Sequence, residues 1–134
     1  GVTFTDATTL KPTFSNFYPA ATTPANSEDI TAFVNDDPFQ EYIIASDATL
    51  GSTLALRKSK IGLTYATTAA AGSTTTGKSS VQLGISTAAT TAKQLRVVRV
   101  AEDPENQDQT AANCSLVVKV NLHQYTVGSL ATGI

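Results

Sequence analysis

The chain has 134 residues and a formal net charge of −2, and only 15% of its residues are charged. This length is typical of one domain and is sufficient to bury a hydrophobic core. The negative balance excludes a generic nucleic-acid binder, so any nucleic-acid role requires a local basic patch. We identify no signal peptide and no apolar run long enough to span a membrane.

Threonine, alanine and serine are abundant in the sequence and make up for the low share of charged residues. A Thr-rich, weakly charged surface favours β structure and does little to keep molecules apart. The composition therefore fits two classes of protein: one whose surface is covered by copies of itself, and a secreted β domain. The sequence begins at Gly1 and contains no Met, as expected of a mature chain without its initiator Met or of a trimmed chain.

Residues 1–18 are predicted to form an N-terminal hairpin or arm. The first residues alternate apolar side chains with threonines, which is typical of a strand. Leu10–Tyr18 contains Pro12, which cannot donate to a sheet, so this run is predicted to be an edge strand or an extended arm. The turn between the two runs is expected near Asp6–Thr9.

Ser27–Asn35 is the segment predicted as a helix. Ser27 is a suitable N-cap, and Ile30, Phe33 and Val34 fall on one helical face. An irregular strand is the alternative. The next segments, Phe39–Ala45 and Ser52–Ile61, are predicted as strands around a turn.

Residues 80–127 are predicted to form the core as a three-stranded antiparallel meander. Its expected strands are Val81–Thr87, Gln94–Ala101 and Ser115–Val127. The last strand alternates an apolar parity, which includes Leu116, with a polar parity, which includes Lys119. We therefore predict a mainly β (α+β) fold, one domain over residues 1–134, with at most one or two short helices.

Residues that commonly perform catalysis are scarce. His123 lies in the middle of a predicted strand, without a nucleophile motif nearby, and is expected to be a surface residue. Cys114, the single cysteine, is expected to be a small buried hydrophobe, with an intersubunit bridge as the alternative. Gly72–Lys78 has the glycine spacing of a phosphate loop but lacks the flanking strand and helix. No enzyme, metal site or cofactor is predicted.

Cations occur on or beside the predicted strands. If these strands are neighbours, the cations share a sheet face with amide, hydroxyl and aromatic side chains, which suits RNA. The competing interpretation is an ordinary solvated polar face, which needs the same residue types. The candidate RNA-binding residues are Gln82, Ser86, Arg96, Lys119, Asn121 and His123, with Lys58 and Lys60 as an extension of the patch.

The order of segments in the last third of the chain resembles the coat proteins of single-stranded RNA bacteriophages, the levivirus-like family. The matching segments are SVQLGIST, AATTAK, QLRVVRV, the loop AEDPENQDQTAAN and CSLVVKVNLHQYT. The resemblance implies a sheet that continues across a homodimer, dimers that tile an icosahedral shell, and an inward sheet face that binds a genomic RNA hairpin. It also implies a location in the virion and, during assembly, in the cytoplasm of a bacterial host.

One feature departs from that family. Its members usually end in two helices that pack over the partner's sheet, whereas only Gly128–Ile134 follow Val127 here. The sequence therefore leaves open which segment covers the apolar sheet face. The candidates are Ser27–Asn35 and the segment around Pro38. The alternative function is a secreted or surface β-sandwich module, pilin-like or adhesin-like, without a nucleic-acid role. A capsid subunit of another fold, such as a jelly roll, would need more strands than the sequence predicts.

Overall fold

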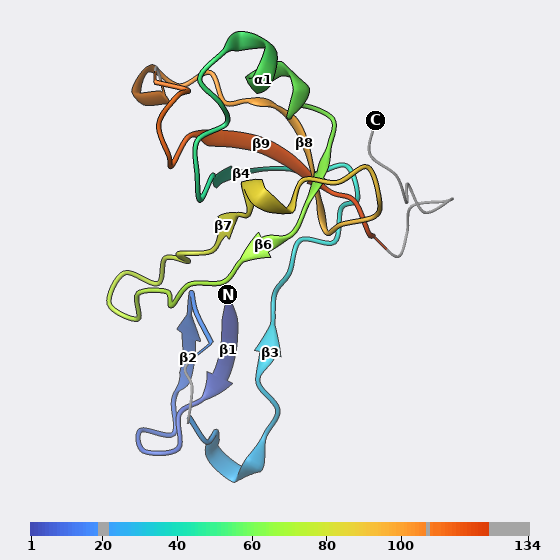
Figure 1. Ribbon diagram of the computed structural model, residues 1–134. Coiled ribbons are helices and arrows are strands. Elements are labelled where there is room, and N and C mark those ends of the chain that lie inside the picture. The colour runs from blue at the N-terminus through green and yellow to red at the C-terminus, as the bar shows by residue number, and fades with distance from the viewer. Residues whose placement is uncertain (19–21, 107, 124–134) are drawn as a thin grey trace. The chain divides into compact units, whose positions relative to one another are not determined.

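Figure 1 shows the chain as a computed structural model, which describes residues 1–18, 22–106 and 108–123. The fold is mainly β, as the sequence predicts, with three antiparallel sheets and one short α-helix in this part of the chain. No helix among these residues is long and apolar enough to cross a membrane.

The chain forms two compact units. Unit 1 comprises Gly1–Asp36 and Ala71–Ser80, and unit 2 comprises Asp37–Ala70 and Val81–Ile134. Unit 1 contains one of the three sheets and unit 2 contains the other two.

Unit 1 is built on a three-stranded sheet in the order β2-β1-β3. Its strands are β1 (Val2–Thr5), β2 (Pro12–Ser15) and β3 (Thr31–Ala32). β1 and β2 pair antiparallel, and β2 is an edge strand. The predicted N-terminal hairpin and the edge position of Pro12 are thus confirmed.

The hairpin turn is held by Asp6. One Asp6 carboxylate oxygen accepts hydrogen bonds from the Thr8 and Thr9 amides, at 3.0 and 2.7 Å, and from the Thr9 hydroxyl at 3.0 Å. These bonds, led by the Thr9 amide, lower the pKa of Asp6. The turn lies where the sequence predicts it, because a short acidic side chain can satisfy the exposed amides of a turn.

The predicted helix over Ser27–Asn35 is wrong. A 3₁₀ helix covers Ala25–Ser27, and Asn26 and Ser27 have positive φ angles of 56° and 55°, which an α-helical N-terminus cannot accommodate. The chain then extends, and β3 pairs with β1. The strand alternative is observed at Thr31–Ala32, where pairing with β1 stabilises a segment that would be only marginally stable as a short undocked helix.

Unit 2 contains a four-stranded antiparallel sheet in the order β4-β9-β8-β5. The strands are β4 (Glu41–Ala45), β5 (Thr64–Tyr65), β8 (Leu95–Val100) and β9 (Ser115–Val120). The predicted pairing of the second and third meander strands and the predicted strand at Phe39–Ala45 are confirmed. The observed last strand ends at Val120, and residues 124–127 of its predicted extent lie outside the described residues.

The first strand of the predicted meander does not join this sheet. β7 (Gln82–Leu83) pairs instead with β6 (Thr67–Thr68), and a 3₁₀ helix follows at Ile85–Thr87. The Gly84 carbonyl accepts the Thr87 amide at 2.9 Å, which bends the chain away. The edge of β8 that the meander would have used is taken by β5.

The predicted strand over Ser52–Ile61 is also wrong, because this segment contains the α-helix. Helix α1 spans Leu54–Ser59, and the Thr53 hydroxyl caps it by accepting the Leu56 amide at 3.3 Å. Leucine, alanine, arginine and lysine all favour helices, and the basic residues of the last turn complement the helix dipole. Capping and propensity therefore outweigh the irregular apolar alternation on which the strand prediction depended.

The core of unit 2 covers one face of the four-stranded sheet. β9 contributes Leu116 and Val118, each 1% exposed, as the predicted parity requires. Against them pack Leu50 and, beyond α1, Ile61 and Leu63. The buried cluster also contains Tyr65, Leu83, Ile85, Val97 and Cys114. The apolar face is thus covered by segments of the same unit, from both sides of α1 and from β7.

The loop between β8 and β9 contains a 3₁₀ helix at Pro104–Asn106. The Asn106 amide group donates to the Ala101 and Ser115 carbonyls, at 2.8 and 3.0 Å, and its oxygen accepts the Ser115 amide at 2.9 Å. One side chain therefore closes the end of the strand pair, where the acidic loop would otherwise leave backbone groups unpaired.

Candidate nucleic-acid interface

The opposite face of the four-stranded sheet gathers cations from neighbouring strands. Lys119 on β9 is paired with Arg96 on β8 and with Glu41 on β4. Paired residues in an antiparallel sheet point to the same side. The charged face, as we name it, consists of Glu41, Ile43, Arg96, Arg99, Val117 and Lys119.

A β-bulge in β8 brings both arginines to this face. The register advances from Val97, opposite Val118, to Arg99, opposite Val117, so Val98 is the extra residue. Strict alternation would place Arg96 and Arg99 on opposite faces, because they are three residues apart. The extra residue of the bulge shifts the alternation by one, so both arginines point to the same face.

Glu41 is bonded to two of the cations. Its carboxylate lies 3.5 Å from the Lys119 ammonium and 3.7 Å from the Arg99 guanidinium. The side chains of Glu41, Lys119 and Arg99 are 40%, 38% and 53% exposed. Exposed pairs of this kind contribute only about 0–1 kcal/mol each, so the cations remain exchangeable partners for another anion.

Apolar side chains complete the charged face. Ile43 is 72% exposed, and Val117, on the nominally polar parity, is 3% exposed. A surface hollow of about 550 Å³ lies over this part of the sheet. Its lining includes Ile43, Arg99, Glu102, Asp103 and Val117. A large exposed apolar residue on an edge strand is typical of a surface that another chain covers.

The structure brings together some of the predicted RNA-binding residues. Arg96 and Lys119 are directly opposed across β8 and β9. Asn121 lies beyond the end of β9 and is 3% exposed, with its amide group donating to the Lys93 carbonyl at 3.0 Å. His123 is half-buried two residues further along. Only the first two are thus placed on the charged face by the strand register.

The other predicted residues lie on different elements. Gln82 is on β7, where its amide group donates to the Asn113 side chain at 2.6 Å, and Ser86 is exposed in the following 3₁₀ helix. Lys58 is on α1 and Lys60 is the residue that follows it. Since the strands predicted at Val81–Thr87 and Ser52–Ile61 are not formed as expected, neither pair joins the charged face through the sheet.

Sequence reasoning missed Glu41. Its only signal was a carboxylate near the start of a predicted strand, and nothing in the sequence indicates that β4 pairs with β9. The pairing of two strands far apart along the chain decides which charges meet.

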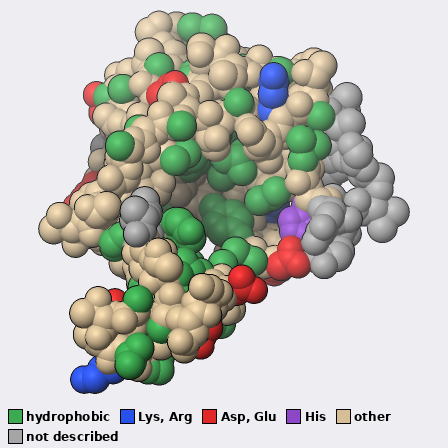
Figure 2. All heavy atoms as spheres, turned by 90° about the horizontal axis from the view of Figure 1, so that it is seen from below, with side chains coloured by type: hydrophobic (Ala, Val, Ile, Leu, Met, Phe, Trp, Pro, Cys, Tyr) green, Lys and Arg blue, Asp and Glu red, His purple; other side chains and the backbone are tan. Residues whose placement is uncertain are grey.

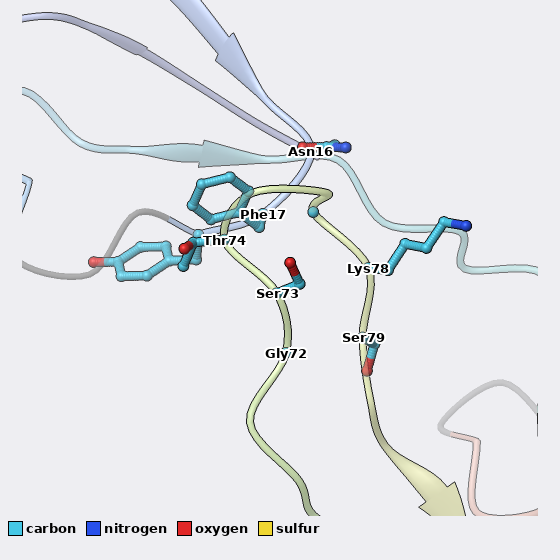
Figure 3. A pocket seen from close by; sticks show the side chains of 9 residues that line it. Asn16, Phe17, Gly72, Ser73, Thr74, Lys78 and Ser79 are labelled. Carbon is cyan, nitrogen blue, oxygen red and sulfur yellow. The ribbon is translucent and has the colours of Figure 1, made fainter.

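The glycine-flanked segment Gly72–Lys78 forms a closed loop in unit 1. The Ser73 amide donates to the Lys78 carbonyl at 3.0 Å, and the Gly77 amide donates to the Ser73 carbonyl at 2.8 Å. Figure 3 shows Phe17 beside this loop, and the Lys78 side chain directed away from that ring. The amides that would cradle a phosphate are used internally, and β7 follows where a nucleotide loop requires a helix.

No group of three or more His, Cys, Asp or Glu side chains is placed to hold a metal ion among the described residues. Cys114 is 2% exposed, which confirms a buried position, and burial raises the pKa of its thiol. A buried thiol with a raised pKa is a poor nucleophile.

No family model, no curated protein and no solved structure matches this chain.

Proposed function

We propose that this chain is a viral coat protein that dimerises, assembles into a closed icosahedral shell and binds single-stranded genomic RNA. The observation that carries the proposal is the charged face, where three cations, Arg96, Arg99 and Lys119, lie on two paired strands. Lysine and arginine contact phosphates, and a sheet face can hold unpaired bases. On this proposal the chain acts in the virion as a structural protein, with no enzymatic activity or cofactor, after assembly in a bacterial cytoplasm.

Exposed apolar side chains support self-association. Large apolar residues are exposed in both units, and Figure 2 shows hydrophobic side chains at the surface with few charged ones between them. The most exposed are Leu10, Phe14, Tyr18, Phe33, Val34, Phe39 and Ile43. A surface of this kind is expected on a subunit that contacts copies of itself.

Unit 1 gives a second argument. Among its described residues only Val2 and Ala25 are buried hydrophobics, whereas Leu10, Phe14 and Val34 are more than 60% exposed. A three-stranded sheet needs an apolar face packed against something to be stable. Another copy of the chain is the partner we propose for unit 1.

We propose that the dimer extends the four-stranded sheet at β4. The other edge strand, β5, already bonds to residue Ala89 through Thr64. Within the described residues, β4 pairs with β9 on one side, and on the other side only Ser46, just beyond β4, forms an isolated bridge, with Leu83. A strand with a free edge can pair with the same strand of a second copy.

Electron microscopy of the purified protein tests the assembly. Negatively stained samples should contain uniform closed shells, and RNA extracted from them should be protected from nuclease. A monomer that copurifies with no nucleic acid would contradict the proposal and favour the alternative of a surface β module.

Charge-removing variants test the RNA face. R96A/K119A should weaken binding of single-stranded RNA and flatten its salt dependence, by about 0.7 in the logarithmic slope per lost phosphate contact. K58A/K60A removes the same charge at and just after α1 and is the control. Shells should still form with both variants. Equal weakening by the two would show that net charge, and not the charged face, binds RNA.

A further inference from the structure

Glu41, on the edge strand β4, contacts two of the three cations to which we assign RNA binding. It contacts Lys119 at 3.5 Å and Arg99 at 3.7 Å. Lys119 in turn is the strand partner of Arg96. One carboxylate therefore neutralises part of a cluster of three cations.

An RNA phosphate and the Glu41 carboxylate would use the same donors. Lysine and arginine side chains bind either anion through charge-assisted hydrogen bonds. The Glu41 charge also repels a phosphate that lies within several ångströms of it, and the exposure of all three side chains lets them exchange partners. An RNA phosphate that binds here must therefore displace the Glu41 carboxylate from these cations or bind despite its repulsion.

We propose that Glu41 is an intramolecular competitor of RNA, which holds Lys119 and Arg99 in position and lowers the affinity of the charged face for polyanions. The inference rests on the proposed function, and it concerns regulation of the same site. Weak or short polyanions fail to displace the carboxylate, whereas an RNA that makes many contacts at once succeeds. The carboxylate thus raises selectivity at the cost of affinity.

The competing explanation is a structural ion pair that only joins β4 to β9. Cross-strand pairs of opposite charge do stabilise sheets modestly. The two roles differ in what removal of the charge does. A competitor, once removed, leaves RNA binding tighter, whereas a structural pair leaves it unchanged or weaker.

Fluorescence anisotropy with a labelled oligouridylate tests the inference in wild-type protein, E41Q and E28Q. Glu28 lies in unit 1 and forms no ion pair among the described residues, so E28Q makes the same change of net charge away from the cluster. E41Q should bind about threefold to tenfold more tightly than wild type, with a steeper salt dependence, and E28Q should bind as wild type does.

A second comparison localises the effect. In a K119A/R99A background, E41Q should give no gain, because the donors it would release are gone. Equal affinity of E41Q and wild type, or an equal gain in E28Q, would overturn the competitor role while leaving RNA binding intact. Failure of every protein, wild type included, to bind the oligonucleotide would overturn the proposed function and the inference together.

Discussion

Single polar side chains form hydrogen bonds with backbone groups that the strand pairing leaves without a partner. Asn106 bonds to Ala101, just after β8, and to Ser115 at the start of β9. Asp47 accepts the Ile85 amide at 2.8 Å and the Thr68 hydroxyl at 3.1 Å. In both cases one short side chain bonds to segments that are not adjacent in sequence. Such residues give the loops a fixed geometry that apolar burial alone does not provide.

Replacement of Asn106 tests this role. N106A removes three hydrogen bonds and leaves the Ser115 amide without this acceptor, so the free energy of unfolding should fall by about 2–3 kcal/mol. Urea denaturation measures the loss. Q109A, in the same loop, is the control and should change stability by less than about 0.5 kcal/mol. Equal effects of the two substitutions would contradict the role of Asn106.

The burial of Tyr65 predicts that the folded protein loses stability at alkaline pH. Its ring is fully buried, its hydroxyl donates to the Lys60 carbonyl at 2.9 Å, and burial raises its pKa from 10.0 to about 12. The unfolded chain ionises first as the pH rises, so Tyr65 contributes its full stabilisation below pH 10 and loses it between pH 10 and pH 12.

Urea midpoints measured across that pH range test the effect of Tyr65. Y65F should lower stability near neutral pH by about 1–2 kcal/mol, through the unpaired Lys60 carbonyl, and should show a shallower alkaline decline than wild type. Y18F alters a ring that is 65% exposed and should retain the wild-type decline. An unchanged decline in Y65F would show that another group causes it.

At the scale of elements, local sequence signals determine where α1 forms, whereas long-range pairing determines which strands are neighbours. α1 exposes Leu54 and Leu56, by 56% and 49%, so burial of an apolar face does not account for it. The Thr53 cap, the helix-forming residues and the basic last turn do. β7 shows the opposite case. The chain bends after Gly84, and β7 pairs with β6 and not with β8.

The cap of α1 provides a test. T53A removes the side-chain acceptor of the Leu56 amide and should destabilise the protein by about 1 kcal/mol. S52A, at the preceding exposed position, should have a smaller effect. Circular dichroism and urea denaturation measure both variants. A T53A protein as stable as wild type would show that contacts other than the cap hold this helix.

At the scale of the whole molecule, the proposed assembly depends on the free edge of β4. Lysine on an edge strand is a known obstacle to strand addition. I43K should therefore reduce dimer and shell formation severalfold while the monomer keeps its fold, as measured by light scattering and circular dichroism. L54K adds the same charge on α1 and should assemble normally. Normal assembly by I43K would exclude the β4 edge as the dimer contact.

The sequence by itself determined the features that depend on local pattern. The N-terminal hairpin, the strands at Phe39–Ala45 and Gln94–Ala101, the strand that begins at Ser115, and the apolar parity of β9 all follow from alternation and turn residues. The buried position of Cys114 follows from its residue type. These features are predictable because they need only the near neighbours of each residue.

Only the tertiary structure decided which segments meet. Local pattern favoured a helix at Ser27–Asn35, whereas pairing with β1 makes β3 there. A bulge in β8 places Arg96 and Arg99 on the same face as Lys119. The register of β4 against β9 brings Glu41 into contact with Arg99 and Lys119. A one-residue change of register reverses the direction of a side chain. The candidate site is therefore set by long-range register, which sequence alternation does not encode.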